Sequence, residues 1–163
     1  MMNDAIYEAR RGGYEISTDP ARLDLDRIVA LMRTSYWAAE RTRESTEASL
    51  RNSRCFGLYD TSHERQIGLT RVVTDYATFA WVCDVIVDEE YRGNGLGVWM
   101  METVLADPRL RGVRRWTLAT RNAHALYARF GSFHWPSPAT GWRYAPAPEG
   151  RIPQCHTGGT RPL

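Results

Sequence analysis

The sequence predicts a single mixed α/β (α+β) domain, a central sheet flanked by helices, and two observations lead to this class. The 163 residues, 43% hydrophobic and 25% charged, have the size and composition of one globular domain with one core. Runs with strand-like alternation are interleaved with runs at helical spacing, in the coarse order β-α-α-β-β-β-α-β-α-β. This mixture predicts a sheet with helices packed on it, since neither element type dominates.

The first elements are a short strand and two helices. "YEIS", residues 14–17, is the first expected strand, and "TDPARLDLDRIVALMRTSYW" predicts a helix that follows it. Asp19 is its expected N-cap, with Pro20 at the first helical position. Its buried face would consist of Leu25, Ile28, Val29, Met32 and Tyr36. A second helix is expected over residues 44–52.

Three strands are expected in the middle of the chain. They are "CFGLY" at 55–59, "QIGLTRVV" at 66–73 and "FAWVCDVIV" at 79–87. The polar segments "DTSHER" and "TDYAT" that join them are typical of turns. The three strands should therefore be sequential neighbours in the sheet.

The last third returns to alternating helices and strands. "GVWMMETVLAD" predicts a helix that Pro108 ends, and "VRRWTLAT", residues 113–120, predicts the next strand. Asn122 is the expected cap of a short helix, "AHALYARF", which Gly131 would end. The domain is expected over residues 1–145, with a last strand near Trp135, Trp142 and Tyr144. Residues 146–163 are rich in proline and glycine and are expected to be a loose tail.

Composition and charge exclude several classes of function. The formal net charge of +2 is too small to indicate a nucleic acid or an anionic membrane as partner. No window approaches the roughly 20 apolar residues of a membrane span, and without an apolar leader a cytoplasmic location is expected. Three scattered cysteines and four scattered histidines predict no metal. All 21 basic residues are arginine, so no lysine is available for acylation.

The segment "YRGNGLG", residues 91–97, joins an expected strand to an expected helix. Glycines at 93, 95 and 97 would leave several backbone N–H groups free at the positive end of the helix dipole. Such an arrangement binds phosphate or pyrophosphate, although a turn that binds nothing is an equal alternative for this segment alone. A Walker P-loop is excluded because the chain lacks lysine, and the glycine spacing is not that of a dinucleotide fingerprint.

The surroundings of the glycines resemble a known family. The run from Arg92 to Gly97 is similar to the Arg/Gln-x-x-Gly-x-Gly/Ala signature of the GNAT acyl-CoA-dependent N-acyltransferases, and Asn122 and Tyr127 follow on a short helix. The resemblance covers roughly residues 14–144 and is to single-domain bacterial members. It implies a mixed sheet that is splayed between its fourth and fifth strands, and acetyl-CoA as co-substrate.

The resemblance also implies roles for individual residues. The backbone of Val85, Ile86 and Val87 would pair with the pantetheine arm of coenzyme A. The pyrophosphate would lie on the segment of Arg92, Gly93, Asn94, Gly95, Leu96, Gly97 and Val98. Asn122 would contact pantetheine, and Tyr127 would protonate the departing thiolate. Without the resemblance, core packing would be the simpler interpretation of Tyr127, and helix capping that of Asn122.

The general base is less clearly indicated. The familiar glutamate of the family is missing from the strand before the glycine segment, and Asp84 is the only acid within that strand. Period-2 alternation would place Asp84 on the same face as Val82 and Ile86. A base and a partner in an ion pair with Arg71 are equal alternatives, because a carboxylate inside an apolar strand needs a partner or a function. Asp75 is a second candidate base, although a turn residue is the simpler interpretation.

The acceptor pocket is expected opposite the donor, lined by the first helices and their loop. Its candidate residues are Tyr36, Trp37, Arg71 and Phe79, although core packing is an alternative for each aromatic residue. His134 and Trp135 would border it. Acidic residues on the second helix and before it, Glu40, Glu44 and Glu47, would attract a cationic acceptor or form a solvated face.

These observations predict an enzyme that transfers an acyl group, preferably acetyl, from coenzyme A to an amine of a small molecule. The amine would attack directly in a ternary complex, without a covalent enzyme intermediate. Alternatives are a donor on another pantetheine carrier or an aminoacyl ester, and a non-catalytic acyl-CoA-binding module. The sequence leaves the acceptor and the oligomeric state open, with a homodimer as one option.

Overall fold

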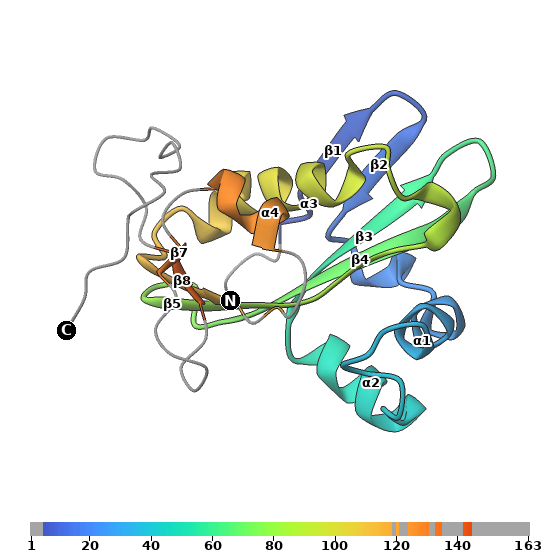
Figure 1. Cartoon of the computed structure of the whole chain (residues 1–163), viewed down its shortest axis with the longest axis horizontal. Coiled ribbons are helices and arrows are strands. Elements are labelled where there is room, and N and C mark those ends of the chain that lie inside the picture. The colour runs from blue at the N-terminus through green and yellow to red at the C-terminus, as the bar shows by residue number, and fades with distance from the viewer. Residues whose placement is uncertain (1–4, 119, 121–123, 131–132, 135–141, 145–163) are drawn as a thin grey trace.

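The structure, a computed structural model, describes residues 5–118, 120, 124–130, 133–134 and 142–144 (Figure 1). The expected tail over residues 146–163 lies outside this range, as do Asn122, Gly131 and Trp135. Within it the chain forms one mixed sheet with helices on both faces, which confirms the expected fold class. Among the described residues, no helix has the length and apolar character needed to cross a membrane.

The sheet contains eight strands in the order β1-β2-β3-β4-β5-β6-β8-β7. Neighbouring strands are antiparallel except β5 and β6, which are parallel. The strands are β1 (Glu8–Arg11), β2 (Tyr14–Ser17), β3 (Arg54–Asp60), β4 (Arg65–Thr74), β5 (Phe79–Val87), β6 (Arg115–Leu118), β7 (Phe133–His134) and β8 (Trp142–Tyr144). The expected strands at 14–17, 55–59, 66–73, 79–87 and 113–120 are all confirmed, and β8 confirms a last strand at Trp142 and Tyr144.

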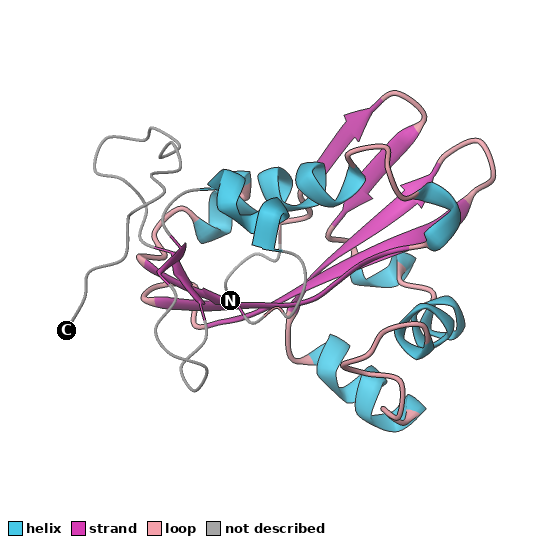
Figure 2. Cartoon of the chain, viewed as in Figure 1, coloured by secondary structure: helices cyan, strands magenta, loops and turns pink. Residues whose placement is uncertain are grey.

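Two pairs of α-helices cover the two faces of the sheet (Figures 1 and 2). α1 (Leu25–Arg33) and α2 (Arg43–Arg51) lie on one face, and α3 (Leu96–Ala106) and α4 (His124–Tyr127) lie on the other. Short 3-10 helices are η1 (Pro20–Arg22), η2 (Glu89–Tyr91), η3 (Pro108–Leu110) and η4 (Ala128–Phe130). The sheet therefore separates two cores.

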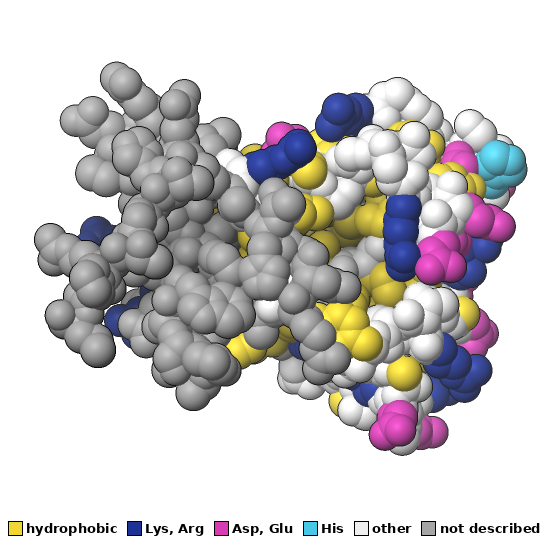
Figure 3. Space-filling model, viewed as in Figure 1, with side chains coloured by type: hydrophobic (Ala, Val, Ile, Leu, Met, Phe, Trp, Pro, Cys, Tyr) yellow, Lys and Arg dark blue, Asp and Glu magenta, His cyan; other side chains and the backbone are white. Residues whose placement is uncertain are grey.

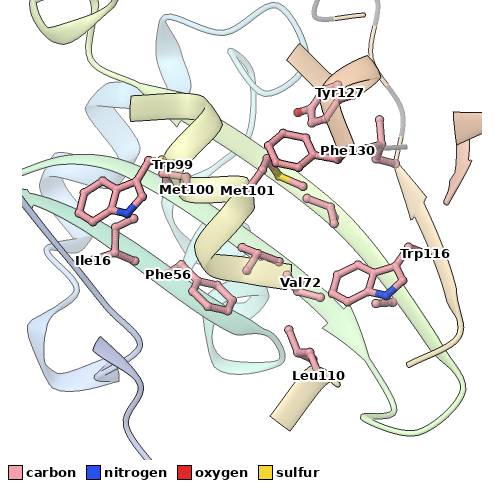
Figure 4. Packing of buried hydrophobic residues seen from close by; sticks show 14 of the residues in the cluster. Ile16, Phe56, Val72, Trp99, Met100, Met101, Leu110, Trp116, Tyr127 and Phe130 are labelled. Atoms are coloured by element: carbon pink, nitrogen blue, oxygen red, sulfur yellow. The ribbon is translucent and has the colours of Figure 1, made fainter. Parts of the chain in front are cut away.

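The larger core lies between the sheet and α3. Met100, Met101 and Val104 of α3 are at most 1% exposed and pack with Phe56 of β3 and Trp116 of β6 (Figure 4). The smaller core lies under α1 and joins Ile28, Leu31 and Met32 to Leu69 of β4 and Ile86 of β5. Because β5 contributes to both cores, its position is fixed from both faces.

The expected first helix is in fact two helices. Asp19 caps only the short η1, where its side chain accepts a hydrogen bond from the backbone N–H of Ala21. Asp24 is the N-cap of α1 and accepts from the N–H of Arg27 at 2.9 Å. The break occurs because Leu23 has an extended backbone, with ψ of 119°. α1 ends at Arg33, so Tyr36 is outside the helix and 47% exposed, and its expected place on a buried helix face is wrong.

Strand β1 was not expected from the sequence. Its residues, "EARR", lack apolar alternation and are mostly exposed. The strand exists because its backbone pairs with β2 at the edge of the sheet. Backbone pairing of this kind cannot be predicted from the pattern of apolar and polar side chains alone.

The sheet opens along the second half of β5. β6 pairs with β5 only where Arg115–Leu118 lie opposite Phe79–Val82, so within the described residues Cys83–Val87 extends past its neighbour. This is the expected splay between the fourth and fifth predicted strands, which are β5 and β6. The open edge faces the glycine segment that follows β5.

A β-bulge at Asp84 changes the direction of the side chains along β5. The register with β4 shifts between Leu69 and Arg71, and Asp84 has a φ of +54°. Val82 therefore packs in the core under α3, and Ile86 packs in the core under α1. The expectation that simple alternation places both on the face of Asp84 is wrong, because the bulge adds one residue to the strand.

Candidate active site

A pocket of about 1120 Å³ lies where the sheet opens. The described residues that line it come from the end of α1 and the following loop, the second half of β5, the glycine segment and α4. Figure 3 shows the hollowed, largely hydrophobic surface on this face of the molecule. The pocket thus joins the expected donor site and the expected acceptor site in one cavity.

The glycine segment forms the start of α3. Gly93 and Gly95 have φ values of +82° and +72°, a left-handed conformation that favours glycine. Gly95 is the N-cap and supplies no side chain, and the first intrahelical bond runs from Trp99 N–H to the Gly95 carbonyl at 3.1 Å. The N–H groups of residues 96–98 precede that bond and are left for another acceptor. The segment therefore has the free donors that an anion needs.

The glycine segment is held in place by its own side chains. Arg92 Nε donates to the Val87 carbonyl at 3.1 Å, and its guanidinium pairs with Glu89 at 3.1 Å. Asn94 Nδ2 donates to the Tyr91 carbonyl at 3.0 Å. Arg92 remains half exposed at the rim and adds positive charge. Neither side chain fills the space above the glycines, where an added Cβ at 93 or 95 would have no neighbour within 4 Å.

Tyr91 attaches the segment to the end of β3. Its hydroxyl donates to Asp60 at 2.9 Å, and His63 Nδ1 lies 2.7 Å from the same carboxylate oxygen. The hydrogen bond from His63, with smaller contributions from Tyr91 and the Ser62 N–H, lowers the pKa of Asp60 to about 2. Asp60 is therefore ionised near neutral pH and fixes the tyrosine that precedes Arg92.

Val85, Ile86 and Val87 line the pocket along the open edge of β5. On the other edge, Ile86 pairs with Leu69 and Val87 with Gly68 of β4. Apart from the Val87 carbonyl, which accepts from Arg92, the backbone groups that point away from β4 are thus available to an extended ligand. An open strand edge that leads to a helix start fits a pantetheine arm ending in a pyrophosphate, so the residues present fit coenzyme A.

Asp84 lies at the other end of the pocket, between two arginines. Its carboxylate accepts from Arg41 at 2.7 and 3.1 Å, from Arg71 Nε at 2.8 Å and from Trp37 Nε1 at 3.2 Å. Burial opposes ionisation, but hydrogen bonds and attraction from Arg41 and Arg71 outweigh it and hold the pKa of Asp84 below its ordinary value. The ion pair that the sequence offered as an alternative is therefore present, and Asp84 has little tendency to accept a proton.

Tyr127 closes the pocket on the side of α4. Its side chain is 6% exposed and packs at the border of the larger core, near Phe130 (Figure 4). Burial raises the pKa of its hydroxyl well above the ordinary value. The hydroxyl therefore keeps its proton at neutral pH and is a hydrogen-bond donor on a residue that lines the pocket. Asn122, expected one turn earlier, lies outside the described residues.

An aromatic wall lies near the mouth of the pocket. Tyr36 and Trp37 meet edge to face, with ring centroids 5.0 Å apart, and both line the cavity. Trp81 of β5 also lines it and is 39% exposed. Phe79 does not join them: it lies at the opposite end of β5, opposite Arg115, and is not among the described residues of the lining. Phe79 is two positions before Trp81 in β5, and its expected place in the acceptor pocket stays a prediction.

Other candidates lie away from the cavity. Asp75 caps the β4–β5 turn, accepting from the N–H groups of Ala77, Thr78 and Phe79, and a hydrogen bond from Thr78 lowers its pKa. The acidic residues expected to attract a cation are not among the described residues that line the pocket; they are Glu40, Glu44 and Glu47. His134 lies in β7, and its side chain is outside the described part of the chain, as is Trp135.

Arg41 and Trp81 are among the lining residues that sequence reasoning missed. Arg41 lies in the loop before α2, where no periodicity marks it. Trp81 had a signal, because it falls on the outward side of β5, opposite to the buried Ala80 and Val82. Exposed hydrophobic residues that gather at one cavity, as Trp81 does with Tyr36 and Trp37, point to a binding surface.

Among the described residues, no group of three or more histidine, cysteine, aspartate or glutamate side chains could hold a metal ion. Cys83 lines the pocket, and burial raises the pKa of its thiol to about 11. A thiol that stays protonated is a poor nucleophile.

A mixed sheet that opens beside a glycine-rich helix start, with a buried tyrosine across the opening, defines a class of α/β acyltransferases. The chain belongs to the acetyltransferase (GNAT) family, which it matches over residues 8–132. This confirms the family indicated by the glycine segment and its surroundings. It is also consistent with the observed fold, because the matched range covers six strands of the sheet, β1 to β6, and the helices up to η4.

Individual relatives agree with this assignment. The Gibberella zeae protein FG08082, a candidate acetyltransferase by name, is 32% identical over 140 residues, which cover 73% of this chain and 78% of that protein. The crystal structure of a GNAT-family protein of Xanthomonas campestris pv. campestris is 39% identical, with a TM-score of 0.71, over 76% of this chain and 86% of that one. Staphylococcus aureus SA2161 is 27% identical, with a TM-score of 0.64, over 82% of this chain and 99% of that one.

Proposed function

We propose that the protein is an acyl-CoA-dependent N-acetyltransferase that moves an acetyl group from acetyl-CoA to a primary amine of a small molecule. The observation that carries this proposal is the continuous path from the open edge of β5 to the free N–H groups at the start of α3. A GNAT-family acetyltransferase of Elizabethkingia anophelis binds acetyl-CoA on a similar fold, at 15% identity and a TM-score of 0.52. Cytoplasmic location and bacterial origin stay predictions, since relatives include fungal and plant proteins.

The donor would be held at two places. The N–H groups of residues 96–98 and the charge of Arg92 would bind the pyrophosphate. The backbone of Val85, Ile86 and Val87 would bind the pantetheine arm as an added strand. Holding the donor along this edge would place its thioester near the bulge at Asp84, where N–H groups of the strand can polarise the carbonyl.

The transfer would proceed by direct attack. The amine nitrogen forms a bond to the thioester carbon, the carbon–sulfur bond breaks, and the sulfur receives a proton from the Tyr127 hydroxyl. The nitrogen loses one proton to water, because Asp84 is already held by Arg41 and Arg71, and water returns a proton to the Tyr127 oxygen. The raised pKa of Cys83 and the absence of lysine from the chain support transfer without a covalent enzyme intermediate.

Release of free thiol from acetyl-CoA tests this proposal. We expect thiol release that depends on an added primary amine, with the acetylated amine identified by mass spectrometry. Protein incubated with acetyl-CoA alone should keep its unmodified intact mass, because no side chain in the described part of the chain is poised to accept the group. Binding of acetyl-CoA without turnover of any amine in a broad panel would instead support a non-catalytic module.

Asp84→Asn separates the two roles of this carboxylate. If Asp84 were the base, Asp84→Asn would lower kcat by about 100-fold or more at neutral pH. This loss of kcat would disappear at a pH where the acceptor amine is already neutral. We expect a deficit that stays the same at every pH, because the ion pairs favour a role in positioning Arg41 and Arg71. Asp75→Asn, in the β4–β5 turn, is the matched control and should keep the kcat of the unmodified protein at every pH.

The same variant should show a pH effect on stability. The pKa of Asp84 is lowered in the folded protein, so its ionised form stabilises the fold above about pH 4. This contribution is lost as the pH falls through the lowered pKa. Thermal unfolding from pH 3 to 7 should therefore show a smaller acid-dependent loss in Asp84→Asn than in the unmodified protein.

A further inference from the structure

The acceptor end of the pocket carries an excess of positive charge. Arg41, Arg71 and Asp84 form a cluster in which two guanidinium groups share one carboxylate. Their side chains are 22%, 12% and 3% exposed, so the cluster is largely removed from water. No other acidic residue is among the described residues that line the cavity. The cluster therefore retains a net charge of about +1 where solvent screens it poorly.

Arg41 has hydrogen-bonding capacity to spare. An arginine has about five N–H donors, and Asp84 occupies one on each terminal nitrogen of Arg41. Arg71 also uses two donors, from Nε to Asp84 and from a terminal nitrogen to Ser53 at 2.8 Å, but its side chain is less exposed than that of Arg41. Within the described part of the chain, the remaining donors of Arg41 have no acceptor. A partly buried guanidinium with unused donors is well suited to bind an anionic oxygen.

The walls near this cluster are aromatic. Tyr36, Trp37 and Trp81 line the same cavity and are the described aromatic residues with the largest exposed fractions. Trp37 also connects the wall to the charged cluster through its hydrogen bond to Asp84. Exposed rings gathered at one cavity favour a ligand with an apolar or planar body.

We propose that the acceptor is an amine that also carries a carboxylate and an apolar or aromatic body, the chemistry of a hydrophobic amino acid. Arg41 receives the carboxylate, and the wall of Tyr36, Trp37 and Trp81 contacts the side chain. The inference rests on the proposed function and narrows its acceptor. It also reverses the expected attraction of a cationic acceptor, because a second positive charge on the ligand would meet the excess positive charge of the cluster.

Binding of a product analogue tests the inference without turnover. N-acetyl-phenylalanine and N-acetyl-phenylalaninamide differ in the carboxylate alone and contain no reactive amine. We expect the acid to bind the CoA-loaded protein at least about tenfold more tightly than the amide, by calorimetric titration. Equal or tighter binding of the amide would overturn the inference.

Two arginine variants test whether the preference for the acid over the amide depends on Arg41. Arg41→Gln should remove most of the preference for the acid, since it brings the cluster to neutrality. Arg33→Gln, on the exposed end of α1 and outside the lining, should keep the preference and is the matched control. A preference that survives unchanged in Arg41→Gln contradicts the role of Arg41. If Arg41→Gln fails to fold, the comparison of acid and amide on the unmodified protein still decides.

Failure of the inference is distinguishable from failure of the proposed function. Binding of CoA and turnover of diamines or simple alkylamines, with no binding of the acid, would leave the N-acetyltransferase in place and exclude the carboxylate-bearing acceptor. Absence of CoA binding would exclude the proposed function and also the inference that rests on it. Turnover of hydrophobic amino acids that exceeds the turnover of their amides, when the two are compared at equal concentrations of unprotonated amine, would support the proposed function and the inference.

Discussion

Tyr127→Phe is expected to lower kcat by about 100-fold or more while leaving the binding of acetyl-CoA nearly unchanged. The substitution removes only the hydroxyl, and the ring continues to pack at the border of the larger core. Burial raises the pKa of this hydroxyl, so it remains protonated over the whole range in which the enzyme would be assayed. The variant therefore loses the group that donates a proton or a hydrogen bond to the departing sulfur.

Tyr59→Phe is the matched control for Tyr127→Phe. Tyr59 is 7% exposed, burial likewise raises its pKa, and its hydroxyl donates to the Arg22 carbonyl at 3.1 Å. It is not among the described residues that line the pocket. We expect Tyr59→Phe to alter stability and leave kcat unaffected. A Tyr127→Phe enzyme with the kcat of the unmodified protein from pH 6 to 9 would contradict the assignment of the acid.

Gly95→Ala is expected to weaken CoA binding by about tenfold or more. Gly95 has a φ of +72°, and an alanine there costs about 1–2 kcal/mol in the left-handed conformation. The chain can relieve that strain only by rotating the backbone at the N-cap of α3, which turns the N–H groups of residues 96–98 away from the phosphates. Loss of one or more charge-assisted hydrogen bonds accounts for the expected weakening.

Gly12→Ala provides a control with the same backbone strain. Gly12 lies in the β1–β2 turn with a φ of +58°, and an added Cβ would have no neighbour within 4 Å, as at Gly95. Both variants should therefore lose a similar free energy of unfolding. Only Gly95→Ala should weaken CoA binding, measured by calorimetry. Equal affinities in the two variants would exclude the glycine segment as the pyrophosphate site.

The fold could be predicted from the sequence where side-chain periodicity is strong. β3, β4, β5 and α3 are recognisable because burial on one or both faces imposes a pattern on their residues. The break at Leu23, between η1 and α1, could not be predicted, because two aspartates compete to cap the helix and tertiary contacts decide between them. Asp24 gains from a second contact, the hydrogen bond from its N–H to Gln66 at 2.9 Å.

The donor side of the site was predictable, and the acceptor side was not. A phosphate-binding helix start depends on backbone conformation within one segment, so the glycines of residues 93–97 carry the signal locally. The acceptor side depends on residues from separate elements, which meet only after folding. The bulge at Asp84 is decisive here, because it turns the carboxylate toward Arg41 and Arg71 and no sequence alternation anticipates it.

The most direct test of the central claim compares the affinities of CoA and 4′-phosphopantetheine for the unmodified protein. If the glycine segment holds the pyrophosphate while β5 holds the pantetheine arm, CoA should bind with one-to-one stoichiometry and much more tightly than 4′-phosphopantetheine, which keeps one phosphate and lacks the second phosphate together with the 3′-phosphoadenosine. Equal affinities, or no binding of CoA, would contradict the account, since the free N–H groups at the start of α3 would then contribute nothing to the donor.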